Sequence, residues 1–106
     1  AAFYDKICAE FGVGRMMDSD AFIAWGKPGG GAGIAMTKPA DGQPATVGNG
    51  VMAAFQAENK EQVDKVYKLA IELGAKDEGP AGPRGDNFYA GYFRDPDGNK
   101  LNVFCM

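Results

Sequence analysis

Few side chains in this sequence have the type and spacing that catalytic chemistry requires. The two cysteines, Cys8 and Cys105, lie near opposite ends of the chain and fit no metal-binding or redox motif. No histidine is present to activate either thiol as a nucleophile, so we expect both cysteines to be structural. The absence of histidine also excludes histidine-based triads, histidine-containing zinc sites and imidazole acid–base relays from this sequence.

Two further segments imitate ligand-binding loops. Asp95, Asp97 and Asn99 have the spacing with which a calcium-binding EF-hand loop begins, but Gly98 comes too early and no glutamate follows at the twelfth position. The glycine-rich KPGGGAG segment (27–33) lacks the spacing of a phosphate-binding loop and the helix that should follow it. We predict a tight turn for the first segment and a hairpin loop for the second.

The composition is that of an ordinary globular domain. Of the 106 residues, 45% are hydrophobic and 24% are charged, and the formal net charge is −3. This charge argues against nucleic acid and against an anionic membrane surface as partners, because both require clusters of Lys and Arg. No apolar run is long enough to span a membrane, and no signal-peptide pattern is present. We therefore expect a cytoplasmic protein that forms one domain.

The hydrophobic periodicity predicts two helices and a series of short strands. Phe3, Ile7 and Phe11 share one face of a first helix. A second helix is predicted over residues 60–73, between a capping pair formed by Asn59 and Gln62 and a terminating glycine, Gly74. Strands are predicted at 14–17, 21–27, 33–38, 50–56, 88–94 and 100–106, with a further short strand near 76–79. The first six of these strands contain none of the 14 acidic residues.

The two halves of the chain repeat the same order of elements. The second half reads as strand, helix and three strands, and the first half reads as helix and three strands. We therefore expect one domain over residues 1–106, with module one at 1–38, a linker at 39–48 and module two at 49–106. The first module lacks its opening strand, which we expect in roughly 10–15 residues upstream of Ala1.

Four segments resemble the vicinal oxygen chelate superfamily, which comprises the glyoxalase, bleomycin-resistance and extradiol-dioxygenase proteins. They are FYDKI (3–7), DGQPATVGNGVMAAF (41–55), QVDKVYKLAIELGAKDEGPAGPRG (62–85) and YAGYFRDPDGNKL (89–101). The resemblance is nearest to bacterial proteins described as lactoylglutathione-lyase-like. It implies an α+β fold of paired βαβββ modules whose sheets curl around one cavity, usually within a homodimer.

The resemblance also implies a divalent metal ion, for which this sequence lacks the ligands. Metal-dependent members hold the ion with ligands from four strands, of which three are visible here. The usual histidine is replaced by Met52, the usual glutamate is replaced by Asn102, and the strand at 33–38 offers no acid. Neither a thioether nor a neutral amide substitutes for imidazole and carboxylate ligands. We therefore predict no metal and no other cofactor.

The expected function is binding of a small organic molecule in an apolar cavity, as in bleomycin-resistance proteins, rather than catalysis. The side chains predicted to line that cavity are Met52, Asn102, Trp25, Tyr92 and Phe104. Two alternatives remain open. One is a metal-dependent lyase or isomerase of the lactoylglutathione-lyase type, and the other is a structural or regulatory dimer whose cavity is filled by its own side chains.

Overall fold

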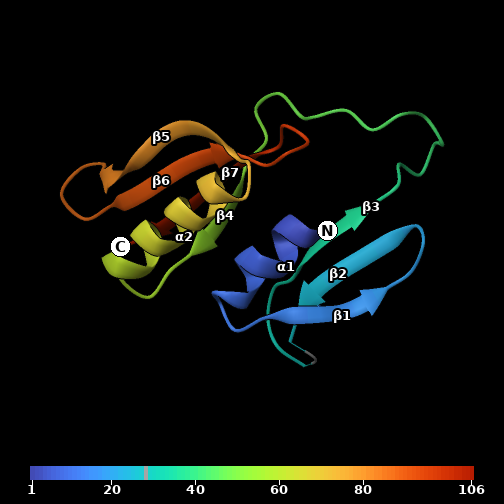
Figure 1. Cartoon of the computed structure of the whole chain (residues 1–106), viewed down its shortest axis with the longest axis horizontal. Coiled ribbons are helices and arrows are strands. Elements are labelled where there is room, and N and C mark those ends of the chain that lie inside the picture. Colours follow the sequence, from blue (N-terminus) through green and yellow to red (C-terminus); the bar gives the residue numbers. More distant parts are fainter. Residues whose placement is uncertain (28) are drawn as a thin grey trace. The chain divides into compact units, whose positions relative to one another are not determined.

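A computed structural model describes residues 1–27 and 29–106 (Figure 1). Within these residues the chain forms two helices and seven strands, which are divided between two compact units, 1–46 and 47–106. This arrangement confirms the predicted α+β fold. None of the described helices is long and apolar enough to cross a membrane. The predicted hairpin loop at 27–33 includes Pro28, which lies outside the described residues.

The first unit consists of a helix and a three-stranded antiparallel sheet. Helix α1 (Ala2–Ala9) is followed by β1 (Gly14–Asp18), β2 (Phe22–Gly26) and β3 (Ile34–Thr37), and the strand order is β1-β2-β3. The buried side chains of α1 recur with the helical period, as the sequence predicted, and the core of the unit also includes Ala24 and Trp25 of β2. The chain leaves α1 through Gly12, which has a φ of 71°.

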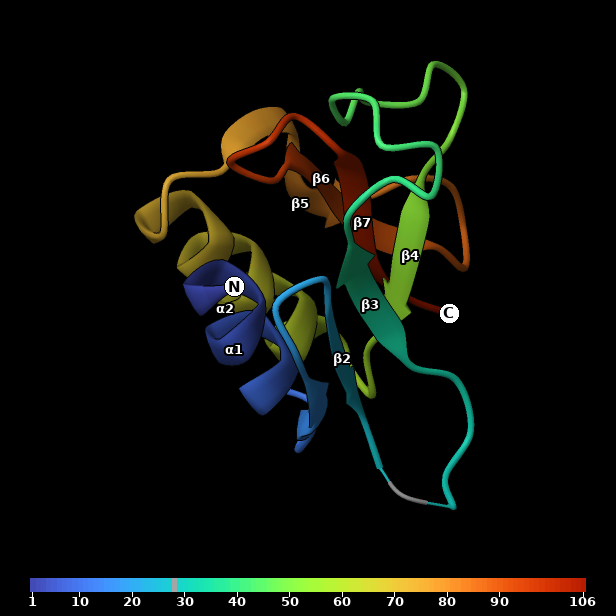
Figure 2. The ribbon, with the colours of Figure 1, turned by 90° about the vertical axis from the view of Figure 1, so that its right-hand side faces the viewer.

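The second unit is a complete βαβββ module. It contains β4 (Ala53–Gln56), α2 (Lys60–Glu72), β5 (Lys76–Pro83), β6 (Tyr89–Arg94) and β7 (Lys100–Cys105). The strand order is β4-β7-β6-β5, in which β4 runs parallel to β7 and the other neighbours are antiparallel. Figure 2 shows β4 beside β7 in this sheet. Strand β7 is therefore a central strand, with a neighbour on each side.

Both predicted ends of α2 are confirmed. The Asn59 side chain accepts a hydrogen bond from the Gln62 backbone N–H, and the Gln62 side chain accepts one from the Glu58 backbone N–H, each over 2.8 Å. Gly74 adopts a φ of 100° immediately after the helix, and its N–H donates to the carbonyl of Ile71.

The turn between β6 and β7 is built by Asp95, which is 4% exposed. Its Oδ1 accepts the backbone N–H groups of Asp97 and Asn99, and its Oδ2 accepts the Asn99 side-chain amide. Gly98 has a φ of 95°, which favours glycine. The segment is therefore the tight turn that the sequence predicted, and it fixes the register between β6 and β7.

Two strand boundaries differ from the prediction in ways that affect the candidate site. Strand β1 continues to Asp18, so the expectation that the clearly patterned strands contain no acidic residue is wrong at this position. Its carboxylate pairs with Arg15, which stabilises the extra strand residue. Strand β4 begins at Ala53 rather than at residue 50, because Gly50 has a φ of 91° that interrupts an extended strand. Met52 therefore precedes β4.

Candidate functional site

Helix α2 covers one face of the second unit's sheet. The Tyr67 ring on the helix lies 6.3 Å from the Phe93 ring on β6. A Cβ at Gly91 would lie 3.0 Å from the Tyr67 ring, so the helix packs closely against this strand. Because side chains alternate along a strand, residues in register with Tyr92 lie on the opposite face. We call that opposite face the distal face, and its members on the three paired strands are Ala54, Gln56, Ala90, Tyr92, Arg94, Lys100, Asn102 and Phe104.

Asn102 lies at the centre of the distal face. It is on β7, directly between Ala54 of β4 and Tyr92 of β6. The residue is 2% exposed, and its Oδ1 accepts no hydrogen bond from any residue in the described part of the chain. Buried polar atoms in folded proteins are nearly always hydrogen-bonded. Within the described residues, Asn102 therefore presents a buried acceptor that has no hydrogen-bond partner.

Aromatic side chains continue the distal face beyond Asn102. Phe104 lies two residues after Asn102 on β7, on the same distal face, and is half-buried. Its ring stacks on that of Phe88, with ring centroids 5.5 Å apart and an interplanar angle of 24°. Such an offset pair offers a flat apolar surface to a planar molecule.

Two cations approach the ring of Tyr92. The Arg84 guanidinium carbon lies 5.5 Å from the ring centroid, and the Lys100 Nζ lies 5.7 Å from it. Arg84 follows β5 in sequence and Lys100 begins β7, so two different parts of the sheet each place a cation beside the Tyr92 ring. The centre of the distal face therefore combines a neutral amide, aromatic rings and two positive charges.

The structure brings together three of the five predicted site residues, Asn102, Tyr92 and Phe104. Met52 precedes β4 and is 44% exposed. Trp25 belongs to the first unit, where it is 1% exposed and its indole Nε1 donates to Asp5 over 2.8 Å. Its ring also lies 5.5 Å from that of Tyr4. Trp25 therefore packs within the core of the first unit.

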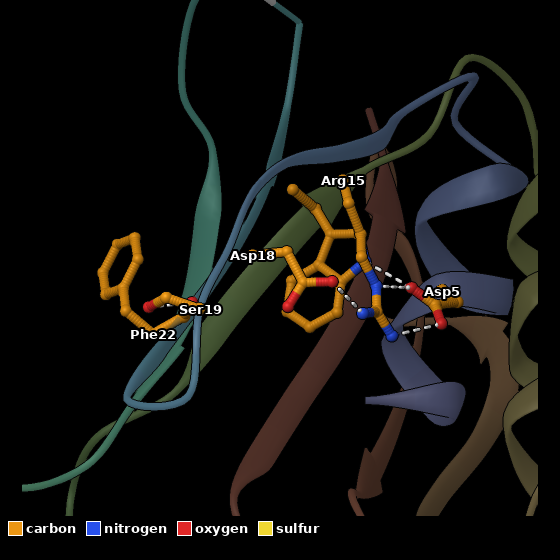
Figure 3. Close-up of polar contacts among 6 residues, drawn as sticks. Asp5, Arg15, Asp18, Ser19 and Phe22 are labelled. Carbon is orange, nitrogen blue, oxygen red and sulfur yellow. Dashed lines mark hydrogen bonds and ion pairs between the residues drawn. The ribbon is translucent and has the colours of Figure 1, made fainter.

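An ion-pair network surrounds Trp25. The Arg15 side chain donates to both carboxylate oxygens of Asp5 and to Asp18, each over 2.8 Å (Figure 3). In the same view, Ser19 and Phe22 form the turn between β1 and β2, in which the Ser19 N–H donates to the Phe22 carbonyl. These hydrogen bonds pair the charge of Arg15 with those of Asp5 and Asp18, and they position α1 against the strands.

Sequence reasoning missed Arg84 and Lys100. Alternation along β7 places Lys100 on the same face as Asn102 and Phe104, so this pattern could have identified the lysine. The position of Arg84 depends on irregular pairing between β5 and β6, where the register shifts between Asp77 and Gly79 and again between Gly79 and Gly82. No local pattern in the sequence predicts those shifts.

The donor set around Asn102 does not fit a divalent metal ion. Within residues 1–27 and 29–106, no group of three Cys, Asp or Glu residues is arranged to hold one. On β5, Asp77 accepts hydrogen bonds from the Tyr67 hydroxyl and the Gly79 N–H, and Glu78 pairs with Arg94. These contacts lower the pKa of both carboxyls. The carboxylates of β5 are thus engaged elsewhere, and positive charges near Tyr92 oppose a cation.

Two hollows that lie within single units have other linings. One, of about 490 Å³, lies between the ends of β2 and β3 and the segment at 39–45. The other, of about 430 Å³, lies beside the N-terminus of α2 and includes Phe88, Tyr89 and Met106. None of the five predicted site residues lines either hollow.

The sequence profile described as "Glyoxalase/Bleomycin resistance protein/Dioxygenase superfamily" matches residues 9–103. No curated protein sequence matches the chain. A glyoxalase/bleomycin resistance protein from Albidiferax ferrireducens is similar in structure, with 33% identity and a TM-score of 0.85 over 98% of this chain and 84% of that one.

More distant structures share the fold alone. A glyoxalase/bleomycin resistance protein/dioxygenase family enzyme from Burkholderia phytofirmans has 21% identity and a TM-score of 0.76, over 98% of this chain and 85% of that chain. A lactoylglutathione lyase from Agrobacterium tumefaciens has 21% identity and a TM-score of 0.69, over 98% of this chain and 81% of that chain.

Proposed function

Because this chain belongs to the Glyoxalase/Bleomycin resistance protein/Dioxygenase superfamily, we propose that it binds a small organic molecule on the distal face, without a divalent metal ion. Asn102, Tyr92 and Phe104 form the binding surface, whereas Met52 precedes β4 and Trp25 packs within the core of the first unit. The function is sequestration of the molecule, or its binding as an accessory module, rather than its chemical conversion.

The observation that carries this proposal is the unpartnered Oδ1 of Asn102. An unsatisfied buried acceptor costs about 1–3 kcal/mol of stability. Leucine has a similar volume and avoids this cost, yet the chain places an amide between Leu101 and Val103, which are both buried on the opposite side of the strand. A ligand that supplies a hydrogen-bond donor removes the cost. The half-buried aromatic rings beside Asn102 supply the apolar surface typical of small-molecule sites.

A metal-dependent lyase of the lactoylglutathione-lyase type is the alternative function. It requires carboxylate or imidazole ligands, whereas the positions that correspond to the family's ligands hold the thioether of Met52 and the amide of Asn102. The likeness to the lyase from Agrobacterium tumefaciens at 21% identity extends to the fold and carries no argument for its activity.

Thermal unfolding in the presence of a chemically diverse set of small molecules tests the proposal. A ligand at 100 times its dissociation constant should add about 2.7 kcal/mol to the free energy of unfolding. We expect at least one compound to stabilise the protein and the stabilisation to be lost in Asn102→Leu. If no compound stabilises the wild-type protein, the proposal is wrong.

Metal analysis distinguishes the two functions. The proposal expects no stoichiometric Ni²⁺, Zn²⁺, Mn²⁺ or Fe²⁺ after dialysis and no turnover of a hemithioacetal. Retention of such a metal, together with turnover that a chelator abolishes, would establish the lyase instead.

We further propose that the protein is a cytoplasmic homodimer. Strand β1 is at the edge of its sheet and all five of its residues are exposed, including Met16 and Met17. Exposed apolar side chains on an unpaired edge are typical of an interface. Sedimentation equilibrium of the wild-type protein and of Met17→Lys tests this assembly, since the variant should shift the protein toward a monomer.

A further inference from the structure

We infer that the molecule bound on the distal face is a small aromatic anion with a hydrogen-bond donor on its ring system. The inference rests on the proposed function and extends it to the chemical class of the ligand. Arg84 and Lys100 hold its carboxylate, Tyr92 and Phe104 contact its ring, and the Oδ1 of Asn102 accepts its donor.

The negative charge of the ligand is inferred from Arg84 and Lys100, because neither cation is paired with a carboxylate of the described residues. Among the described residues, neither Arg84 nor Lys100 forms an ion pair with a carboxylate. Arg94 differs, because it pairs with Glu78 and also donates to the Gly98 carbonyl. Lys100 contributes to the lowered pKa of Glu78 through its charge, without a hydrogen bond to this carboxylate. Both positive charges lie near the Tyr92 ring, and a carboxylate that approaches this ring can form charge-assisted hydrogen bonds with the guanidinium and ammonium groups.

The guanidinium of Arg84 is held in place by the backbone of β5. Its Nη2 donates to the Pro80 carbonyl over 2.7 Å, and its Nη1 donates to the Pro83 carbonyl over 3.3 Å. A Cβ at Gly79 would lie 3.2 Å from Nη2, and a Cβ at Gly82 would lie 3.4 Å from Nη1. Both positions are glycine, so the guanidinium rests against bare backbone. Preorganisation of this kind lowers the entropic cost of binding.

The ring and its donor follow from the neighbours of Asn102. Tyr92 and Phe104 are half-buried, and Ala54, on the other side of Asn102, is exposed. The side chain of Ala54 is only a methyl group, so it leaves room for a planar molecule above β4. A ring seated there contacts the aromatic side chains and brings an N–H or O–H group to the Asn102 acceptor, while its acidic substituent extends toward Arg84 and Lys100.

Two matched sets of probes that differ in charge test the inference. The first set is indole-3-acetate, indole-3-acetamide and tryptamine, and the second is 4-hydroxyphenylacetate, its amide and tyramine. Titration calorimetry should show the tightest binding for the carboxylate in at least one set. Arg84→Gln and Lys100→Gln should each weaken that carboxylate by about tenfold, which corresponds to about 1.4 kcal/mol, and should leave the amide unaffected. Raising the salt concentration should also weaken the carboxylate selectively.

Lys68→Gln is the matched control, because it removes one positive charge from the exposed surface of α2. It should leave all the affinities unchanged. If Arg84→Gln fails to fold, Lys100→Gln and the salt dependence decide the question.

Tighter binding of the amides or amines, or equal losses in Lys68→Gln and Lys100→Gln, would overturn the inference but leave the proposed function intact. Failure of both carboxylates to bind also overturns the inference. The proposed function falls only if the broader screen finds no ligand either.

Discussion

The indole Nε1 of Trp25 donates a hydrogen bond to the carboxylate of Asp5 over 2.8 Å, which joins β2 to α1. Arg15 donates two further hydrogen bonds to the same carboxylate. The hydrogen bonds from Arg15 and then from Trp25 lower the pKa of Asp5 from 3.8 to about 2. Asp5 therefore satisfies a buried indole N–H and anchors the first helix of the chain.

This contact predicts an acid-sensitive component of stability. The pKa of Asp5 is lower in the folded state, so between about pH 4 and pH 2 the unfolded state binds more protons. The stabilisation is fully present above the unfolded pKa of about 4 and is lost as the pH falls through about 2. Asp5→Asn should remove this component and cost on the order of 1 kcal/mol at neutral pH, since the Asp5 side chain is 40% exposed and solvent screens the ion pair. Urea unfolding across this pH range measures both effects.

Asp20→Asn provides the control for that experiment, because Asp20 is exposed in the turn between β1 and β2. The control should keep the wild-type stability at neutral pH, because Asp20 is exposed. An unchanged slope in Asp5→Asn would show that the network around Arg15 contributes nothing to acid stability.

The Cys8 thiol should be unreactive in the folded protein. Burial, and to a smaller degree the charge of Asp5, raise the pKa of this thiol to about 11. Because the thiolate is the reactive form, Ellman's reagent should modify Cys8 in the Cys105→Ser variant only after unfolding in denaturant. Rapid labelling of the native variant at neutral pH would instead indicate an accessible, activated thiol.

The sequence predicts most of this fold, because helix and strand periods are local patterns. Phe3 and Ile7 recur at helical spacing, the side chains of β7 alternate, and Asn59 and Gly74 mark the ends of α2. The extent of β5 was not predictable, since its GPAGP segment contains two prolines and two glycines that normally indicate a turn. Those glycines accept strand geometry here because the strand shifts register twice against β6.

The candidate site was predictable only in part. Asn102 and Phe104 share a strand, so alternation alone places them on one face, and pairing with β6 adds Tyr92. Arg84 reaches Tyr92 through the irregular pairing of β5 with β6, which no local pattern predicts. The prediction for Trp25 could not be made from the sequence. No local feature distinguishes an aromatic strand residue that binds a ligand from one that hydrogen-bonds within the core, as Trp25 does with Asp5.

Loss of the Asn59 side chain should destabilise α2. Its oxygen accepts the Gln62 N–H, one of the backbone donors that have no partner inside the helix. Asn59→Ala should therefore lower the free energy of unfolding by about 1 kcal/mol. Glu72→Ala, at the exposed opposite end of the helix, should change it by less than about 0.5 kcal/mol. Equal effects of the two substitutions in urea unfolding would contradict a specific role for the cap.

Asn102→Leu should separate stability from binding. Removing a buried acceptor that has no partner among the described residues should leave the free energy of unfolding unchanged or raise it by about 1 kcal/mol. The same substitution should abolish the ligand-dependent rise in Tm, because the donor of the ligand then meets a methyl group.

Leu101→Asn is the reciprocal change on the neighbouring residue, which faces the opposite way and is 2% exposed. It should cost at least about 2 kcal/mol, because it buries an amide in the core beneath α2. If Asn102→Leu is destabilised as strongly as Leu101→Asn in the absence of ligand, Asn102 has a structural role. A structural role would account for the asparagine at this position, and Asn102 would no longer support the presence of a ligand.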